Sequence, residues 1–201
     1  MENNKTTLSS EESLSIIAAM IESSKKELRD NGSWYLLWGW LVFFAAAINY
    51  VLILIDYSQP SIAWLLMPLG GVISVFKGRK EDKLQKVRTY VDSFMKYVLI
   101  AFLVCLLMVL FNQGTLKIAT YPMVMMVYGM WLFISGGALA FRPLQIGGWI
   151  NWIFAVIAFY VTFDIQLILL AMAVLLGYII PGYMLRSRYN KAAKSGITTL
   201  A

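Results

Sequence analysis

The stretch YVLIAFLVCLLMVLFNQGTL, residues 97–116, contains 20 residues in succession without a charged side chain. An α-helix rises about 1.5 Å per residue, so about 20 apolar residues cross the roughly 30 Å hydrocarbon core of a bilayer. A soluble core could bury one such run, but six occur here, and the few remaining polar residues cannot cover them. The pattern predicts an all-α polytopic membrane protein. The five other uncharged runs occupy residues 31–55, 57–76, 118–141, 143–163 and 165–185.

The runs predict six transmembrane helices arranged as three in–out–in hairpins. Together they form a transmembrane domain over residues 34–185, between a cytosolic segment, 1–33, and a basic cytosolic tail, 186–201. The expected bounds of the helices are about 34–55, 61–76, 94–113, 119–141, 146–163 and 165–185.

Basic residues predict the orientation of this domain. With the N-terminus inside and one crossing per run, the inner segments hold 16 of the 17 Lys and Arg residues, and only Lys117 falls outside. Cytoplasmic loops of membrane proteins carry an excess of Lys and Arg. We therefore expect a multi-pass protein of the cell inner (plasma) membrane with both termini in the cytosol.

Residues 9–30, SSEESLSIIAAMIESSKKELRD, have the pattern of a cytosolic amphipathic helix. Leu14, Ile17, Ile21 and Leu28 fall on one face at helical spacing. Such a helix can pack on the inner ends of the bundle, lie in the lipid interface or bind a partner. The sequence leaves these three alternatives open.

The most charged stretch is VFKGRKEDKLQKVRTY, residues 75–90, between the second and third runs. Topology explains most of its positive charge, because basic residues hold inner loops in the cytosol. An anchor has no need for an apolar stripe, yet one continues at helical spacing from this loop into the third run. We therefore predict a cytosolic contact face here, made of Leu84, Val87, Val91, Lys83, Lys86 and Arg88.

Small residues and prolines indicate where the transmembrane helices kink or approach closely. Small side chains let membrane helices pack together, and proline interrupts the backbone hydrogen bonds. In the last helix we expect the Pro-Gly pair to bend or unwind the final turns. The predicted packing or kink residues are Pro68, Gly70, Gly71, Gly177, Pro181 and Gly182.

The first and last hairpins share an order of residues. Leu69-Gly70 corresponds to Leu176-Gly177, and Gly39-Trp40 corresponds to Gly148-Trp149, with offsets between 107 and 110. Both hairpins run in the same direction, so a parallel repeat is one interpretation. Chance similarity between apolar helices is the other.

The sequence offers little for catalysis. It has one cysteine, Cys105, and no histidine, which excludes Cys/His zinc sites, His-based triads and an intrachain disulfide. Asp56 and Asp164 are the one candidate pair of carboxylates, and positions at loops or helix caps explain them more simply. We expect no enzymatic activity, no cofactor and no metal. Nucleic-acid binding is also not expected, because the basic loop contains acidic residues and no interleaved aromatic platform.

Uncharged polar residues remain inside the runs. A lone Asn or Ser in a membrane helix commonly forms an interhelical hydrogen bond. Asn151 lies between Trp149 and Trp152 near the inner interface, where we expect it to act first as an anchor and second as a ligand contact. The polar residues in question are Asn49, Ser74, Ser135, Asn151 and Thr162.

Three segments, WYLLWGWLVF (34–43), ESLSIIAAMI (12–21) and GYIIPGYML (177–185), resemble small multipass inner-membrane proteins of Bacteroidota-type bacteria. That group has no assigned activity. The resemblance implies a bacterial inner membrane and carries over no site residues.

The expected function is that of a non-enzymatic integral membrane protein. It lies in the lipid bilayer and engages anionic lipid, or a cytosolic or membrane protein partner, through its cytosolic face. The alternative is a small transporter or channel for a neutral or hydrophobic solute, which the Pro/Gly breaks and the repeat favour. The sequence favours no oligomeric state.

Overall fold

The computed structural model describes residues 14–15, 32–84 and 90–198, and side chains within 14–15, 32–80 and 93–191. Every element in these ranges is helical, which confirms the all-α class for the part of the chain that is described. The elements are α2 (Ser33–Leu54), η1 (Pro60–Leu65), α3 (Leu66–Leu84), α4 (Tyr90–Phe111), α5 (Gln113–Leu116), η2 (Lys117–Ala119), α6 (Thr120–Ala138), α7 (Arg142–Ala158), α8 (Phe163–Val174), η3 (Leu175–Ile179) and α9 (Ile180–Thr198).

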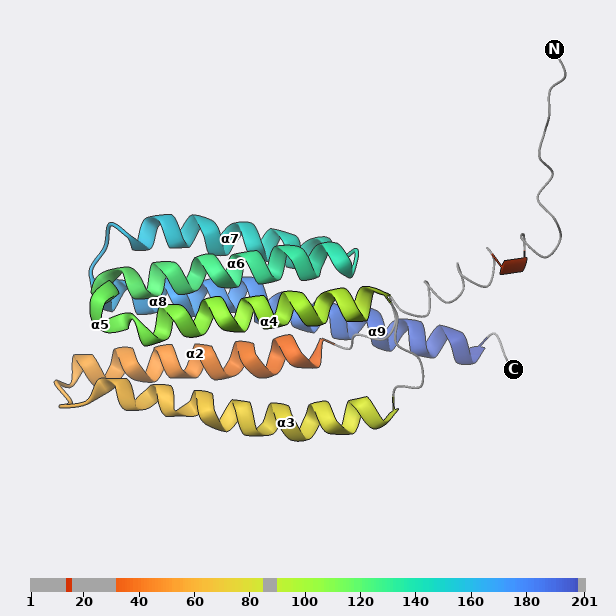
Figure 1. The fold of residues 1–201 in the computed structure, drawn as a ribbon, viewed down its shortest axis with the longest axis horizontal. Helices are drawn as coiled ribbons and strands as arrows, with labels where there is room; N and C mark the ends of the chain where they lie inside the picture. Colours follow the sequence, from red (N-terminus) through yellow and green to blue (C-terminus); the bar gives the residue numbers. More distant parts are fainter. Residues whose placement is uncertain (1–13, 16–31, 85–89, 199–201) are drawn as a thin grey trace, which may run out of the picture.

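The long helices run alternately in opposite directions along one common axis (Figure 1). The centre of the bundle is formed by α2, α6, α7 and the α8–η3 segment. In it α6 packs most extensively against α7, and α2 packs against α8 and η3. Outside this centre, α3 lies against α2 and α4 lies against α6. The first helix therefore packs on the last hairpin as well as on its own partner, α3.

Five helical stretches are long and apolar enough to cross a membrane. They indicate a membrane protein. Of the six crossings predicted from the sequence, the one that is not among these five corresponds to α7. This helix has 17 residues and a length of about 26 Å. The five stretches are Ser33–Leu54, Pro60–Lys80, Ser93–Phe111, Gln113–Ala138 and Phe163–Lys191.

The helix expected over 146–163 begins and ends earlier, at Arg142 and Ala158. Its start is set by a tight turn, in which Ala140 has φ 48° and the Phe141 amide donates to the Gly136 carbonyl at 2.8 Å. Pro143 lies in the first turn of α7, where a missing N–H costs nothing. This turn is the cap that ends α6, and it lets α7 begin at Arg142, inside the segment that the sequence assigned to an inner loop.

The two carboxylates of the candidate pair both lie at helix ends. Asp56 has φ 50° and follows α2, and the Tyr57 amide donates to the Leu52 carbonyl at 3.0 Å. This is the six-to-one hydrogen bond of a Schellman cap. Asp164 lies in the first turn of α8, where a negative charge complements the helix dipole.

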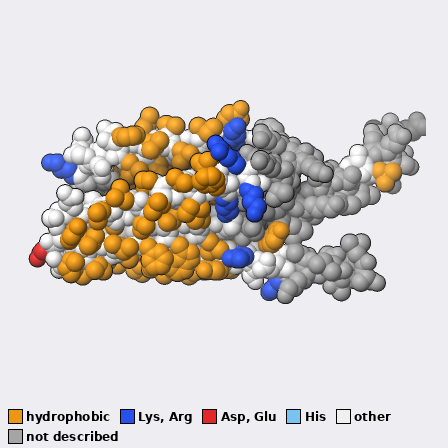
Figure 2. Space-filling model, turned by 90° about the horizontal axis from the view of Figure 1, so that it is seen from below, with side chains coloured by type: hydrophobic (Ala, Val, Ile, Leu, Met, Phe, Trp, Pro, Cys, Tyr) orange, Lys and Arg blue, Asp and Glu red, His pale blue; other side chains and the backbone are white. Residues whose placement is uncertain are grey.

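The two outer helices expose most of their surface. Only 11% of the membrane-length window of α3 and 6% of that of α4 is buried, against 33–44% for the other three stretches. In Figure 2, hydrophobic side chains cover most of the length of the bundle on the face shown. Such a surface suits lipid rather than water.

The last helical segment is longer than expected. Instead of ending at 185, the chain stays helical from Phe163 to Thr198 through α8, η3 and α9. Pro181 has no N–H to donate to the Gly177 carbonyl four residues earlier. The turn that precedes the proline, η3, is a π-helix. The Pro-Gly pair therefore coincides with a widened turn, and the helix continues beyond it.

Candidate functional site: the basic end of the bundle

Lys and Arg side chains gather toward one end of the bundle (Figure 2). We call this the basic end: α2 and α7 start there, and α3 ends there (Figure 1). The opposite end carries Asp56 after α2, Lys117 in η2 and Asp164 in the first turn of α8. The basic residues of the basic end whose side chains are described are Lys77, Arg79, Lys80, Lys96, Arg142, Arg186, Arg188 and Lys191.

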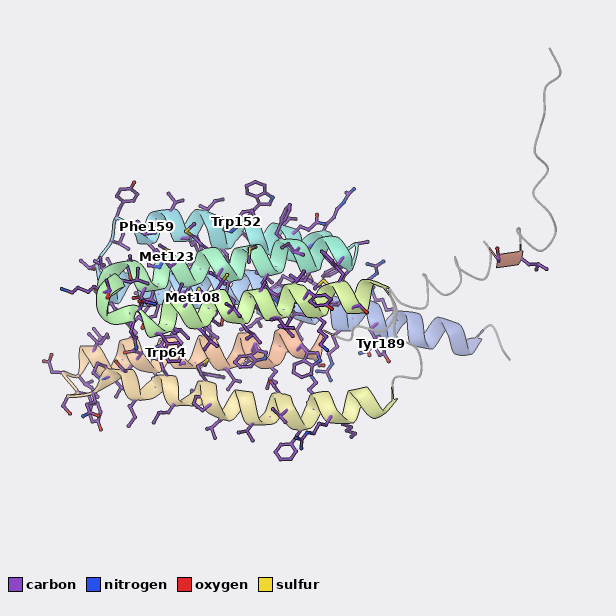
Figure 3. The ribbon with its side chains drawn as sticks, in the orientation of Figure 1. Trp64, Met108, Met123, Trp152, Phe159 and Tyr189 are labelled. Atoms are coloured by element: carbon purple, nitrogen blue, oxygen red, sulfur yellow. The ribbon has the colours of Figure 1, made fainter. Side chains whose placement is uncertain are left out.

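Helix α9 extends beyond the rest of the core at this end. It runs antiparallel to α2, and a Cβ on Gly32, just before α2, would lie 2.5 Å from the Gly182 carbonyl and 3.3 Å from Leu185. Leu185 is buried, with 2% of its surface exposed. From there to Thr198 the helix advances about 20 Å past the start of α2. Tyr189, labelled in Figure 3, lies on this projecting part.

An open pocket of about 440 Å³ lies along the projecting part of α9, and we call it the α9 pocket. The residues that line it are three, four, seven and eight positions apart from the first, so they share one helix face. None of the described lining residues is acidic, and the sequence contains no Asp or Glu after Asp164. The lining residues are Tyr183, Arg186, Ser187, Asn190 and Lys191.

Aromatic contacts lie at the Tyr183 end of the α9 pocket. The indole Nε1 of Trp40 in α2 donates to the Tyr183 hydroxyl at 3.4 Å. The Trp40 ring stacks on Phe44 at 5.3 Å between centroids and meets Phe43 edge-on at 5.7 Å. Trp and Tyr prefer the depth of the lipid headgroups. This cluster therefore indicates the level at which α9 leaves the apolar part of the bundle.

Lys77 joins α3 to α2 at the same end. Its ammonium group lies over the Trp34 ring, 4.3 Å from the centroid, and donates a hydrogen bond to the Ser33 hydroxyl. A cation–π contact of this kind contributes about 0.5–1 kcal/mol at exposed sites. The start of α2 is thus packed against both α3 and α9.

The predicted cytosolic contact face falls largely outside the described residues. Lys86, Val87 and Arg88 are not described, and of Lys83, Leu84 and Val91 only the backbone is. Leu84 is the last residue of α3 and Val91 belongs to α4. The described part of the basic loop is thus a continuation of α3. The amphipathic pattern over 9–30 also lies outside the described residues, apart from Leu14 and Ser15.

The predicted packing residues of α3 differ in their surroundings. A Cβ on Gly70 would collide with the Leu41 side chain and approach the Trp38 ring, both on α2. A Cβ on Gly71 would meet nothing within 4 Å. Pro68 lies exposed in the first turn of α3. Of these three residues, Gly70 is the one that faces another helix.

The predicted glycines of the last segment both lie at close contacts. A Cβ on Gly177 would lie 2.5 Å from the Asn151 amide and 3.2 Å from the Gly147 carbonyl, both on α7. A Cβ on Gly182 would lie 3.0 Å from Leu36 of α2. Gly70 and Gly177, which correspond in the proposed repeat, thus each face the first helix of their own hairpin.

Buried amides join the helices inside the bundle. Asn151 is fully buried and donates to the Gly147 carbonyl at 2.9 Å and to the Ala173 carbonyl of α8 at 3.3 Å. It is therefore an interhelical contact and not an interface anchor. Gln166, also fully buried, donates to Ala158 at 2.7 Å and to Ile118 at 2.9 Å. Sequence reasoning missed Gln166, although it is the one amide just inside the last uncharged run.

A second polar contact joins α2, η1 and α6. The Trp64 indole, labelled in Figure 3, donates to the Tyr121 hydroxyl at 3.1 Å. With its oxygen turned toward the indole, the buried Asn49 amide accepts from Trp64 at 2.7 Å and donates to the Pro60 carbonyl at 3.2 Å. This orientation satisfies both ends of the amide, whereas the reverse leaves Nδ2 with a 3.4 Å contact to Tyr121.

Other polar groups behave differently from expectation. The Ser135 hydroxyl donates to the Leu132 carbonyl of its own helix, and Thr162 is the N-cap residue of α8.

Several buried polar atoms of the described side chains have no hydrogen-bond partner. These are Ser74 Oγ, Thr120 Oγ1, Asn151 Oδ1, Gln166 Oε1 and the Tyr178 hydroxyl.

Comparisons of the chain with protein-family models, with curated proteins and with solved structures each found no match. Among the described residues, no three His, Cys, Asp or Glu side chains come together as metal ligands would. Its function therefore has to be inferred from the arrangement of its own residues.

Proposed function

We propose that the protein is a non-enzymatic integral membrane protein that crosses a bacterial inner membrane six times and engages anionic lipid or a partner protein through its basic end. The single observation that carries this proposal is the projection of α9 past the core with basic residues and no acidic residue on its pocket face. An anionic surface contributes about 1 kcal/mol of attraction per nearby Lys or Arg. The basic end is accordingly the cytosolic end.

In this arrangement α7 is the sixth crossing. Its 17 residues span about 26 Å, and a short helix is accommodated by local thinning of the bilayer at a modest cost. Extensive packing along α6 supports this position, because both helices then share one depth. The resemblance of segments 12–21, 34–43 and 177–185 to Bacteroidota-type proteins favours the inner membrane of such a bacterium.

Reconstitution tests this function directly. The full chain is placed in nanodiscs of phosphatidylcholine alone or with phosphatidylglycerol, and its thermal unfolding is compared. We expect a higher melting temperature with phosphatidylglycerol, and the difference should fall at high salt, since exposed charges are screened. The control is Lys117→Gln at the opposite end, which should leave the difference unchanged. An equal melting temperature in both lipids would contradict anionic-lipid engagement.

The partner alternative has its own experiment. Proteins that co-purify with the full chain from mild detergent are compared with those retained by a variant that lacks residues 1–30 and has the basic residues of 77–88 neutralised. Loss of specific partners in the variant supports docking on this face. Retention of the same partners refutes docking on residues 1–30 and 77–88.

A second candidate function is a small transporter or channel for a neutral or hydrophobic solute. The π-helical turn η3 favours it, because such turns often occur at functional sites. The unpartnered Asn151 Oδ1 beside that turn and the unpartnered Tyr178 hydroxyl within it also favour it, since a polar solute could satisfy them. Uptake of labelled neutral solutes into proteoliposomes tests this function, with empty liposomes as the control. Equal uptake by both would exclude it for those solutes.

A further inference from the structure

We propose that the α9 pocket binds the phosphate group of one anionic phospholipid, whose acyl chains lie along the exposed apolar surface beside it. This inference rests on the proposed engagement of anionic lipid and names its site and ligand class. Three independent features of the described residues support it: the donors on the pocket face, its depth and the apolar surface next to it.

The donors on the pocket face match a phosphate. Arg186 offers a planar guanidinium with five N–H groups, and Lys191, five residues further along the helix, offers an ammonium group. Ser187, Asn190 and Tyr183 add hydroxyl and amide donors on the same face. None of the described lining residues is a carboxylate that would repel an anion or attract a cation. An oxyanion with several acceptor atoms is therefore the group that this face recognises.

Basic residues near a helix C-terminus are also explained by the helix dipole, but that account is insufficient here. The dipole acts within the last turn, and α9 ends at Thr198. Arg186 precedes this end by 12 residues, about three turns. The dipole therefore does not explain the position of Arg186 on the same face as Tyr183.

The level at which the pocket lies relative to the membrane distinguishes the phosphate of a lipid from free phosphate. Tyr183 begins the pocket, and its hydroxyl accepts a 3.4 Å hydrogen bond from Trp40, whose ring stacks on Phe44. On the membrane side, Ile180, Tyr183 and Met184 are 45–50% exposed and apolar. A phosphate bound to Arg186 thus lies at headgroup level, and the attached chains can follow this apolar surface into the bilayer.

Native mass spectrometry of the full chain in detergent tests the proposal, with phosphatidylglycerol and phosphatidylcholine as the titrated probes. In the variant Arg186→Gln/Lys191→Gln, we expect the tightest site for phosphatidylglycerol to weaken roughly 10- to 30-fold. The matched control is Lys96→Gln/Arg142→Gln, which removes the same charge from the same end but no pocket residue; its affinity should stay within about twofold of the original. Both pocket side chains are exposed, so the melting temperature of the pocket variant should not change.

The outcomes separate this proposal from the broader one. If the unaltered chain binds phosphatidylglycerol and phosphatidylcholine equally, anionic-lipid engagement itself fails. If it prefers phosphatidylglycerol but both double variants lose affinity equally, the attraction is a general effect of charge and the pocket proposal is overturned alone. Displacement of phosphatidylglycerol by an equal concentration of inorganic phosphate would overturn the lipid as the source of the phosphate. Tyr183→Phe gives a second check, and a smaller loss of affinity is expected because only one donor is removed.

Discussion

Gly147 of α7 and Gly177 of η3 meet backbone to backbone, and a Cβ on Gly147 would lie 2.7 Å from the Cα of Gly177. No real Cβ can occupy that position unless the two elements separate. The contact brings the π-helical turn against α7, where Asn151 reaches the α8 backbone. It therefore sets the distance between the two helices of the last hairpin.

We predict that Gly147→Ala destabilises the bundle by about 1–3 kcal/mol, because the added methyl group overpacks a contact between two backbones. The gain in helix propensity from Gly to Ala, about 1 kcal/mol, acts in the opposite direction and is smaller than the clash. Thermal unfolding in detergent, followed by circular dichroism, measures the change. The matched control is Gly71→Ala, where a Cβ meets nothing within 4 Å and stability should be equal or slightly higher. Equal losses in both variants would contradict the close contact.

Gln166 donates hydrogen bonds to two backbone carbonyls at the end opposite the basic end, those of Ala158 at the end of α7 and Ile118 in η2. Replacing it with Leu keeps its size but removes the amide that donates to Ala158 and Ile118. We expect a loss of about 0.6–2 kcal/mol, the range of hydrogen bonds between membrane helices. Hydrogen exchange of the amides around residues 158–163 should increase before that of the rest of α7. Gln113→Leu, an exposed position, is the control and should leave exchange unchanged.

The contact between Asn49 and Trp64 predicts an unequal response to two substitutions. With the Asn49 oxygen toward the indole, Tyr121→Phe leaves the 2.7 Å hydrogen bond intact, and its cost should stay below about 0.5 kcal/mol. Asn49→Leu removes that acceptor and the donor to Pro60, so it should cost about 1–2 kcal/mol. Unfolding by a denaturing detergent compares the two variants. If Tyr121→Phe costs as much as Asn49→Leu, the indole binds mainly to the tyrosine.

The proposed orientation predicts the behaviour of reporter fusions. A reporter placed after Gln59, Gln113 or Asp164 should behave as external, because these positions lie at the end opposite the basic residues. A reporter after Lys83 should behave as cytosolic. Alkaline phosphatase and a cytosolic reporter are fused at the same four sites, and at each site only one of the two should be active. A cytosolic signal at Gln59 would overturn the orientation.

Much of the helical pattern could be predicted from the uncharged runs, because charge is costly in an apolar environment and its absence is visible in sequence. The start of α7 could not, because it depends on the turn at Ala140, which places the charged Arg142 inside the helix. The length of α9 was underestimated for a similar reason. Charged residues end an apolar run, but they do not end a helix.

The contacts between helices were less predictable than the helices. Gly70 and Gly71 are adjacent and identical in type, yet only Gly70 faces α2, since helix rotation decides which one does. Gln166 was missed because its partners are backbone carbonyls, which leave no trace in the side-chain pattern. The α9 pocket likewise depends on where Leu185 stops packing against the start of α2.

The packing of α2 on α8 and η3 also has a consequence for biogenesis. Trp40 and Tyr183 are separated by 143 positions in the chain. At a translation rate of 5–20 residues per second, the second residue is synthesised about 7–30 s after the first. During that interval the hairpin of α2 and α3 resides in lipid with its buried face uncovered. A chain that ends before α8 would therefore lack the helices that cover this face of α2 and could not close its bundle.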